Sequence, residues 1–212
     1  HDNLPQVHVI ALYVALVIFV VLLLFGVKAL TGMKIGRVMR ELKEPLLLAF
    51  STTSSESALP KAISAMERLG VPARIVGFVL PAGYSFNLAG STLYLALAAL
   101  FIAQATNKAM PLWLQLEMML TLLISSKGVA AVPRASLVVL ASACATYGLK
   151  VEWIATILGV DAVMDMARTT VNVLGNCLAS VVVGKWEHEL PASAPLFTGA
   201  DTAPAVAAGP VS

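Results

Sequence analysis

A long apolar stretch near the end of the chain, from Val151 to Lys185, carries charges that an ordinary membrane-spanning helix excludes. On an α-helix, at about 100° per residue, its polar side chains fall within a stripe about 80° wide. The members of this stripe are Asp161, Asp165, Arg168, Asn172 and Asn176, with Thr169 at its edge. Each charge at mid-membrane costs about 2.5–3.5 kcal/mol on the insertion scale, so three on one face require a local reason.

Two interpretations of this polar stripe are open. In the first, a structural Asp–Arg pair holds neighbouring helices together and does nothing else. In the second, the stripe binds a charged, polar solute. Because several polar groups converge where a single pair would be enough to lock helices together, the sequence favours a binding site.

The composition places the chain in a lipid bilayer. Of the 212 residues, 58% are apolar and only 12% are charged, and the mean hydropathy is +0.86; a soluble domain carries about twice that charged fraction. We therefore expect an all-α membrane protein in contact with lipid. No basic cluster with interleaved aromatic residues indicates a nucleic-acid partner. Cys144 and Cys177 lie in apolar runs and are expected to pack rather than bind metal, and no cofactor is predicted.

The first part of the chain predicts one span and one hairpin. The span, at about 7–31, contains the apolar run from Val9 to Val27, and the basic cluster that follows it indicates the cytoplasmic side. The next segment, at about 34–70, turns at a serine-rich stretch, and neither arm approaches the roughly 20 residues needed to cross a bilayer. It is predicted to be a re-entrant helical hairpin, with a polar cytoplasmic loop as the alternative.

The second part of the chain repeats this order. The span at about 73–106 contains a proline and a polar stretch from Asn87, and a helix broken at mid-depth is typical of a transporter binding site; a simple proline kink is the alternative. Short arms at about 110–148 predict a second hairpin, and the charged helix at about 151–186 follows. Together the two parts predict an inverted repeat. Residues 191–212 are expected to form a disordered cytoplasmic tail.

Several separate motifs resemble those of one family over about residues 7–190. They are STTSSESALP at the first hairpin tip, NLAGSTLY in the broken helix, SSKGVAAVP at the second tip, and DAVMDMARTTVNVLGN with VVVGKWEHEL in the last helix. In this order they resemble the dicarboxylate/amino acid:cation symporter family of glutamate transporter homologues, and most closely its bacterial proton/glutamate–aspartate symporters. The resemblance implies an elevator-type transport domain, with the substrate held between the two hairpin tips and the last helix.

The resemblance also implies roles for single residues. The arginine that matches Arg168 grips the side-chain carboxylate of the substrate, a task that suits the guanidinium fork. The aspartate that matches Asp165 takes the substrate amino group. The other positions that match the family's substrate site are Ser54, Ser55, Ser91, Val132, Thr169 and Asn172. The positions at or near its coupling-cation sites are Asn87, Asp161, Asn172 and Asn176.

Within the family, these matches narrow the substrate and the ion. Asp165 together with Arg168 implies an acidic amino acid, glutamate or aspartate. The branch that carries C4-dicarboxylates lacks an acid at the first of these positions, and it is the alternative. Asn176 stands where sodium-coupled members usually have an aspartate, so a proton is the expected coupling ion and sodium the alternative. The second hairpin resembles the extracellular gate.

The chain also departs from the family pattern. Ala89 replaces an aspartate that serves a cation site, Leu95 replaces a glutamine, and Ala131 and Arg134 replace small residues around the second tip. The chain begins at the sixth helix of the pattern, without an initiator methionine. The third helix of the transport domain and the scaffold helices, through which the full-length protein is expected to form a homotrimer, are therefore expected to be missing. A truncated remnant that does not transport is the second hypothesis.

Two further function classes fit less well. Ser126 and Lys127 could suggest an intramembrane enzyme, but the sequence has no HExxH or GxSxG motif and no second base placed to activate a serine. An ion channel would need a selectivity ring, which no segment specifies. The expected function is therefore cation-coupled symport of an acidic amino acid by a multi-pass protein of the bacterial inner membrane.

Overall fold

The computed structural model describes residues 4–106, 110–126 and 135–198, and every regular element in these ranges is helical. This confirms the all-α class expected from the sequence. The elements are α1 (Leu4–Thr31), α2 (Ile35–Thr52), α3 (Ser55–Arg68), α4 (Ala73–Phe86), α5 (Ala89–Ala105), α6 (Leu112–Ser125), α7 (Ala135–Thr146), η2 (Val151–Trp153), α8 (Ile154–Leu158), α9 (Asp161–Trp186) and α10 (Pro195–Thr198).

The outer surface suits a lipid environment. Among the described residues, three helical segments are long and apolar enough to cross a membrane, namely Gln6–Thr31, Ala73–Ala105 and Asp161–Trp186. Large apolar side chains point outward from α1 and α6; Phe25 and Trp113, for example, are 61% and 65% exposed. A soluble protein seldom exposes so much contiguous apolar surface, so the chain is a membrane protein.

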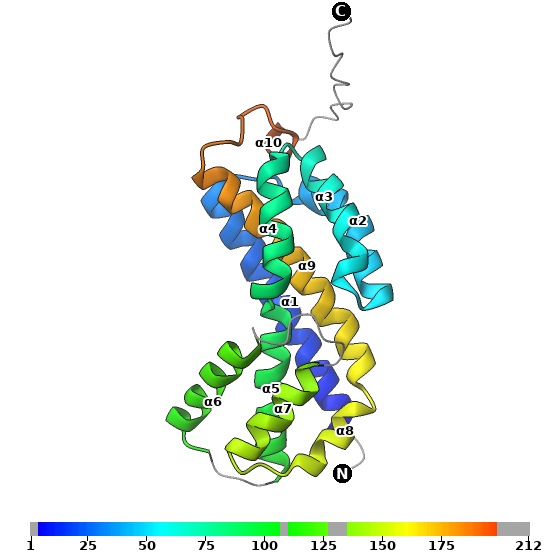
Figure 1. Cartoon of the computed structure of the whole chain (residues 1–212), viewed down its shortest axis with the longest axis vertical. Helices are drawn as coiled ribbons and strands as arrows, with labels where there is room; N and C mark the ends of the chain where they lie inside the picture. Colours follow the sequence, from blue (N-terminus) through cyan, green and yellow to red (C-terminus); the bar gives the residue numbers. More distant parts are fainter. Residues whose placement is uncertain (1–3, 107–109, 127–134, 199–212) are drawn as a thin grey trace, which may run out of the picture.

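Helix α9 is the central element of the molecule. It packs against α1, α2, α3, α4 and α5, and most of its residues are buried (Figure 1). Near the start of α9, the Tyr13 hydroxyl of α1 donates a hydrogen bond to the Val163 carbonyl at 2.8 Å. Because α9 is enclosed by protein, its polar stripe faces other helices instead of lipid.

Two apolar cores are stacked along the length of the molecule, and α9 contributes to both. The first core includes Leu80 of α4, and the second includes Tyr94 of α5. The interruption between α4 and α5, at Asn87 and Leu88, lies between these cores. Pro81 lies inside α4, which continues to its end beyond that residue, so the proline is not what interrupts the helix. Backbone groups freed at such a break are tolerated because they are enclosed by protein.

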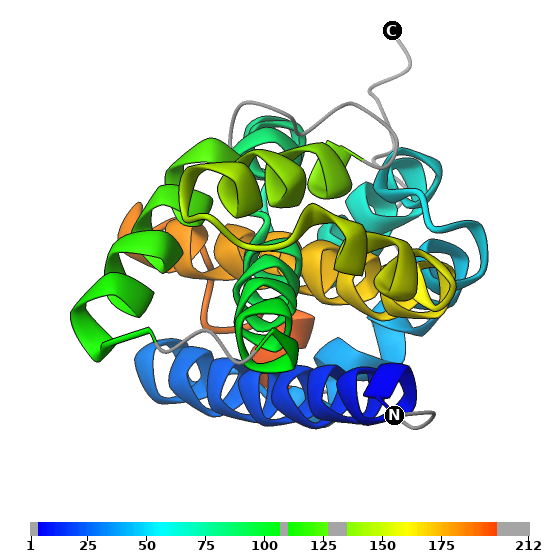
Figure 2. The same cartoon turned by 90° about the horizontal axis from the view of Figure 1, so that it is seen from below.

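Two helix pairs occupy the places of the two expected hairpins. Helices α2 and α3 pack together and connect through Thr53 and Ser54, whereas α6 and α7 pack on each other and on α5. The pairs lie at opposite ends of the molecule (Figure 1). In the view from below, α5 is seen nearly end-on between α1 and α7 (Figure 2). The arrangement packs α2 and α3 on α9, whereas α6 and α7 pack on α5 at the other end of the molecule.

The last helix begins later than the sequence suggested. Residues 151–158 form the short elements η2 and α8, and the long helix α9 starts only at Asp161. Gly159 lowers helix stability by its backbone freedom, and the Asp161 carboxylate is favourable in a first helical turn because of the helix dipole. The charged stripe therefore starts at a helix terminus.

The chain after Pro191 also differs from expectation. Residues 191–198 were expected to be disordered, yet they end in α10, and Leu196 is fully buried. The segment folds onto the molecule because Leu196 and Ala194 are buried in the first core and Phe197 packs against it. The rest of the expected tail, 199–212, lies outside the described residues.

Candidate substrate-binding site

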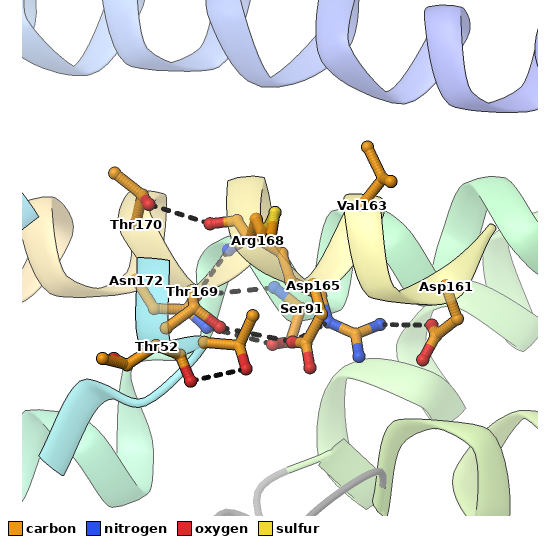
Figure 3. Close-up of polar contacts among 12 residues, drawn as sticks. Thr52, Ser91, Asp161, Val163, Asp165, Arg168, Thr169, Thr170 and Asn172 are labelled. Carbon is orange, nitrogen blue, oxygen red and sulfur yellow. Dashed lines mark hydrogen bonds and ion pairs between the residues drawn. The ribbon is translucent and has the colours of Figure 1, made fainter. Parts of the chain in front are cut away.

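A buried arginine between two carboxylates forms the centre of the candidate site. Arg168 is only 2% exposed. Its Nε donates to Asp165 Oδ1 at 2.8 Å, and its Nη1 donates to Asp161 Oδ1 at 3.3 Å (Figure 3). The Thr169 hydroxyl donates to the same Asp165 oxygen at 3.2 Å. All four residues lie on α9, at the helical spacings that the sequence predicted.

Arg168 also contacts an aromatic ring, and its cluster carries unequal numbers of positive and negative groups. The Arg168 guanidinium carbon lies 4.2 Å from the centre of the Tyr94 ring on α5, which places the cation over the aromatic face. One positive charge faces two carboxylates, so the group carries a net charge of −1 if all three residues are ionised. A buried ion pair gains little net stability, because desolvation offsets the Coulomb attraction. Structural locking alone therefore explains this cluster poorly.

Asn172 joins α9 to the start of α5. Its Oδ1 accepts hydrogen bonds from the backbone N–H groups of Gly90 at 2.8 Å and Ser91 at 3.4 Å, and its Nδ2 donates to the Ser91 hydroxyl at 3.0 Å. The first N–H groups of a helix have no partner within the helix. The Asn172 amide thus caps α5 from a neighbouring helix, and its oxygen is already in use.

Gly90 allows α5 to approach α9 this closely. A methyl group at Gly90 would lie 2.6 Å from the Arg168 carbonyl oxygen, which no side chain tolerates without a backbone shift. The break between α4 and α5 therefore rests directly on the turn of α9 that carries the arginine. The expected residues Ser91, Arg168 and Asn172 are all brought together at this point.

Two further asparagines lie on the α4 side of the same break. The Asn87 amide nitrogen faces Gly175 of α9, where a methyl group would lie 3.5 Å away. Asn176 packs against Gly83 of α4, is fully buried, and neither atom of its amide has a hydrogen-bond partner among the described residues. A buried amide without partners is costly, so Asn176 is a candidate to bind something that the protein alone does not supply.

The tip of the first helix pair presents a short polar turn. Ser54 caps α3, since its hydroxyl accepts a hydrogen bond from the Ser57 N–H at 3.2 Å. Thr53 has a φ of +52°, which is unusual for a β-branched residue. Ser54 and Ser55 are half-buried, and both helices of the pair pack on α9. Figure 3 draws Thr52 of this tip together with Thr169 and Asn172.

Comparison with known proteins identifies the family of this chain. The profile of the Sodium:dicarboxylate symporter family matches residues 5–186. The chain belongs to this family. The resemblance stated from the motifs is thereby confirmed, and members of the family are symporters and not enzymes.

Individual symporters match over most of this chain. The proton/sodium-glutamate symport protein of Geobacillus stearothermophilus is 49% identical over 181 residues, 85% of this chain and 43% of the relative. The proton/glutamate-aspartate symporter of Escherichia coli K12 is 46% identical over 85% of this chain and 41% of its own length. The proton/sodium-glutamate symport protein of Bacillus subtilis is 48% identical over 83% and 41%, respectively. The chain thus spans about two fifths of the length of these symporters.

Two of the four residues that depart from the symporter pattern, Ala89 and Leu95, lie in the described part of the structure. Ala89, which replaces an aspartate of the family pattern, borders a cavity of about 580 Å³. The cavity is also lined by Asn87, Phe19 of α1 and Leu123 of α6. Leu95 is buried in the second core. The residues that line this cavity do not include Arg168, so the charged groups, and not the cavity, define the candidate site. The remaining positions of interest at the second tip, Ala131, Val132 and Arg134, lie outside the described residues.

Tyr94 is a site residue that sequence reasoning did not single out. Its ring lies under Arg168, and Tyr94 is fully buried beside this ion-pair cluster. The signal that could have found it is the helical spacing, because Tyr94 follows Ser91 by three residues and so faces the same neighbour. Gly90 was missed as well, since its role depends on a backbone approach that no local pattern encodes.

Proposed function

We propose that this chain is the substrate-binding part of a cation-coupled symporter that carries glutamate or aspartate across the bacterial inner membrane. The observation that carries the proposal is a guanidinium enclosed by protein and held between Asp161 and Asp165. The printed names of the relatives, which are proton/sodium-glutamate and proton/glutamate-aspartate symporters, support the same substrate class.

Binding would proceed by exchange of carboxylates. The Arg168 fork now donates to one oxygen of each aspartate. A substrate carboxylate that reaches the fork competes with these aspartates and replaces at least one of them. Asp165, once it no longer holds Arg168, can accept hydrogen bonds from the substrate ammonium group. A C4-dicarboxylate, which has no ammonium group, would leave this carboxylate without a partner.

Charge explains why such a substrate needs a coupling cation. The cluster carries a net charge of −1 in the ionised state, and glutamate or aspartate adds a further −1. Two uncompensated negative charges are very unfavourable in a site of low dielectric constant. Protons or sodium ions that enter with the substrate remove this penalty. Cation coupling thus follows from the charge of the site itself.

The cation is proposed to bind beside the break between α4 and α5. Backbone carbonyls freed at the break and the unpartnered amide oxygen of Asn176 are the oxygen ligands that hard cations prefer. Among the described residues no cluster of three or more His, Cys, Asp or Glu side chains could hold a metal ion. We favour the proton over sodium as the coupling ion, because neutral Asn176 stands where sodium-coupled members of the family usually have an aspartate.

The arrangement of helices supports an elevator-type mechanism. We assign α2–α3 and α6–α7 as two re-entrant hairpins that enter from opposite faces, with α1, α4–α5 and α9 as spans (Figure 1). The full-length protein is proposed to form a homotrimer through helices outside this chain. The alternative, a remnant that binds but does not transport, makes the same predictions for binding and differs only in uptake.

Replacement of Arg168 by lysine tests the proposal. The variant R168K keeps the positive charge between the two aspartates but loses the planar fork. A charge-assisted hydrogen bond contributes about 1.5–3 kcal/mol, so we expect glutamate affinity to fall about 10- to 100-fold. The measurement is calorimetric titration of the detergent-solubilised chain with glutamate, aspartate and succinate.

The matched control is R40K, the same substitution at an exposed arginine of α2. It should bind glutamate like the unaltered chain. Equal affinity of R168K and R40K would refute the assignment of the site to Arg168. Tighter binding of succinate than of aspartate by the unaltered chain would favour a C4-dicarboxylate symporter instead.

A further inference from the structure

The chain after α9 folds back over one end of the molecule, where Leu196, the apolar anchor of this segment, is buried together with Ala194. Leu196 of α10 is fully buried in the first core, whereas Ala192, four residues earlier, is exposed. Figure 1 shows α10 beside the ends of α3 and α4, at the end of the molecule where α9 finishes. The anchor thus lies at the base of the α2–α3 pair, far from its tip.

The backbone of Leu196 joins the two arms of this pair. Its N–H donates to the Leu69 carbonyl, just after α3, at 3.1 Å, and its carbonyl accepts from the Lys34 N–H, just before α2, at 2.9 Å. The Lys34 ammonium also donates to the Thr198 carbonyl at 2.7 Å. The arms are connected covalently only at the tip, so Leu196 closes the pair at its other end.

Residues of the neighbouring helices pack closely against the segment that follows α9. Gly70 has a φ of +90°, and a methyl group there would lie 2.8 Å from the Ala194 side chain. Leu190 packs over Gly184 near the end of α9, and Glu189 forms an ion pair with Arg74 of α4. Residues 187–198, which we term the clasp, therefore contact α2, α3, α4 and α9 at one end of the molecule.

We propose that Leu196 is a positioning residue, which holds the base of the α2–α3 pair on α9 and so sets where the tip at Ser54 lies relative to Asp165. Helices α2 and α3 are continuous from base to tip, and a helix transmits displacement at its base to its far end. Release of the clasp lets both arms shift on α9, while the second core, which the clasp does not touch, keeps its packing.

The test compares L196D with A192D, which adds the same charge at an exposed position of the clasp. Hydrogen exchange is followed by mass spectrometry on the detergent-solubilised full chain, together with glutamate titration. For L196D we expect exchange in α2 and α3 to rise about tenfold, because the clasp no longer opposes local opening, and exchange in α5 and α7 to change less than about twofold. A192D should behave like the unaltered chain.

If L196D unfolds, the milder variant L196A tests the proposal in its place. A rise confined to α2, α3 and α10 in L196A supports the clasp, whereas a uniform rise across all helices overturns it. Unchanged exchange in both Leu196 variants also overturns it. The titration rests on the proposed function and should show weaker glutamate binding for L196D. The exchange measurement is independent of the proposed function. A failure of either proposal can therefore be distinguished from a failure of the other.

Discussion

Arg168 is the residue on which the local electrostatics depend. Removal of its charge would leave the buried Asp161 carboxylate and the half-buried Asp165 carboxylate without their shared cation, and loss of one partner of a buried ion pair is strongly destabilising. Its contact with the Tyr94 ring and its two ion pairs hold the guanidinium in one orientation before any substrate arrives. Such preorganisation reduces the ordering cost of binding. Because a substrate carboxylate would have to replace an aspartate at Arg168, the proposed affinity depends on the difference between the Arg168–substrate and the Arg168–aspartate contacts.

The substitution D165N tests the role of the second carboxylate. Asparagine retains an oxygen that accepts from Arg168 and Thr169 but lacks the charge that would attract an ammonium group. We expect aspartate affinity to fall about tenfold more than succinate affinity, because only aspartate has an ammonium group to lose a charged partner. Calorimetric titration with both ligands measures this ratio. Equal losses for the two ligands would contradict the assignment.

The interrupted helix depends on contacts made by another helix. Two residues, Asn87 and Leu88, separate α4 from α5, and the first N–H groups of α5 are capped by Asn172 instead of by a residue of its own segment. Gly90 is required because the first turn of α5 lies on the α9 backbone. The proposed substrate site and the break therefore share one turn of α9, so a change in the packing of one is expected to affect the other.

A pair of glycine substitutions tests this packing. In G90A the new methyl group would meet the Arg168 carbonyl, so we expect the free energy of unfolding to fall by about 1–3 kcal/mol. In G77A, on an open face of α4, the methyl group meets nothing within 4 Å. Loss of backbone freedom in the unfolded chain should then raise stability by up to about 1 kcal/mol. Thermal unfolding in detergent compares the two, and a G90A variant as stable as G77A would disprove the close approach.

At the scale of the molecule, a polar layer separates two apolar cores. The layer contains the break near Asn87 and the charged turn at Arg168, and the helix pairs lie beyond it at either end (Figure 1). Arg168 and Asp161 of this layer are buried, whereas the Asp165 side chain is 26% exposed. If the proposed function holds, the total charge of the layer, and not one ion pair, determines how well an anionic substrate is bound.

Cation linkage follows from this charge balance. If protons enter with the substrate, glutamate affinity should rise as pH falls, because the bound state takes up more protons than the free state. If sodium enters, affinity should rise with sodium concentration at constant ionic strength. Titrations across pH 5 to 8, with sodium replaced by choline, separate the two. Affinity that responds to neither cation would contradict coupling through charge compensation.

The sequence by itself determined the family, the helical class and the polar stripe of α9. The stripe is a local feature, because it depends only on helical periodicity. The polar residues from Asn87 also indicated where the span is interrupted, although the contacts at the break come from α9. The start of α9 at Asp161 was missed by ten residues, because the apolar run from Val151 continues across Gly159 without a change in hydropathy.

Only the tertiary structure decided which partners those residues have. Asn172 was expected at the substrate, yet its amide oxygen caps α5, more than eighty positions earlier in the chain. Leu196 was assigned to a disordered tail because alanine, proline and serine dominate its neighbourhood, yet it closes the base of the α2–α3 pair. Contacts between distant segments depend on the shape of both surfaces, and a local pattern describes only one of them.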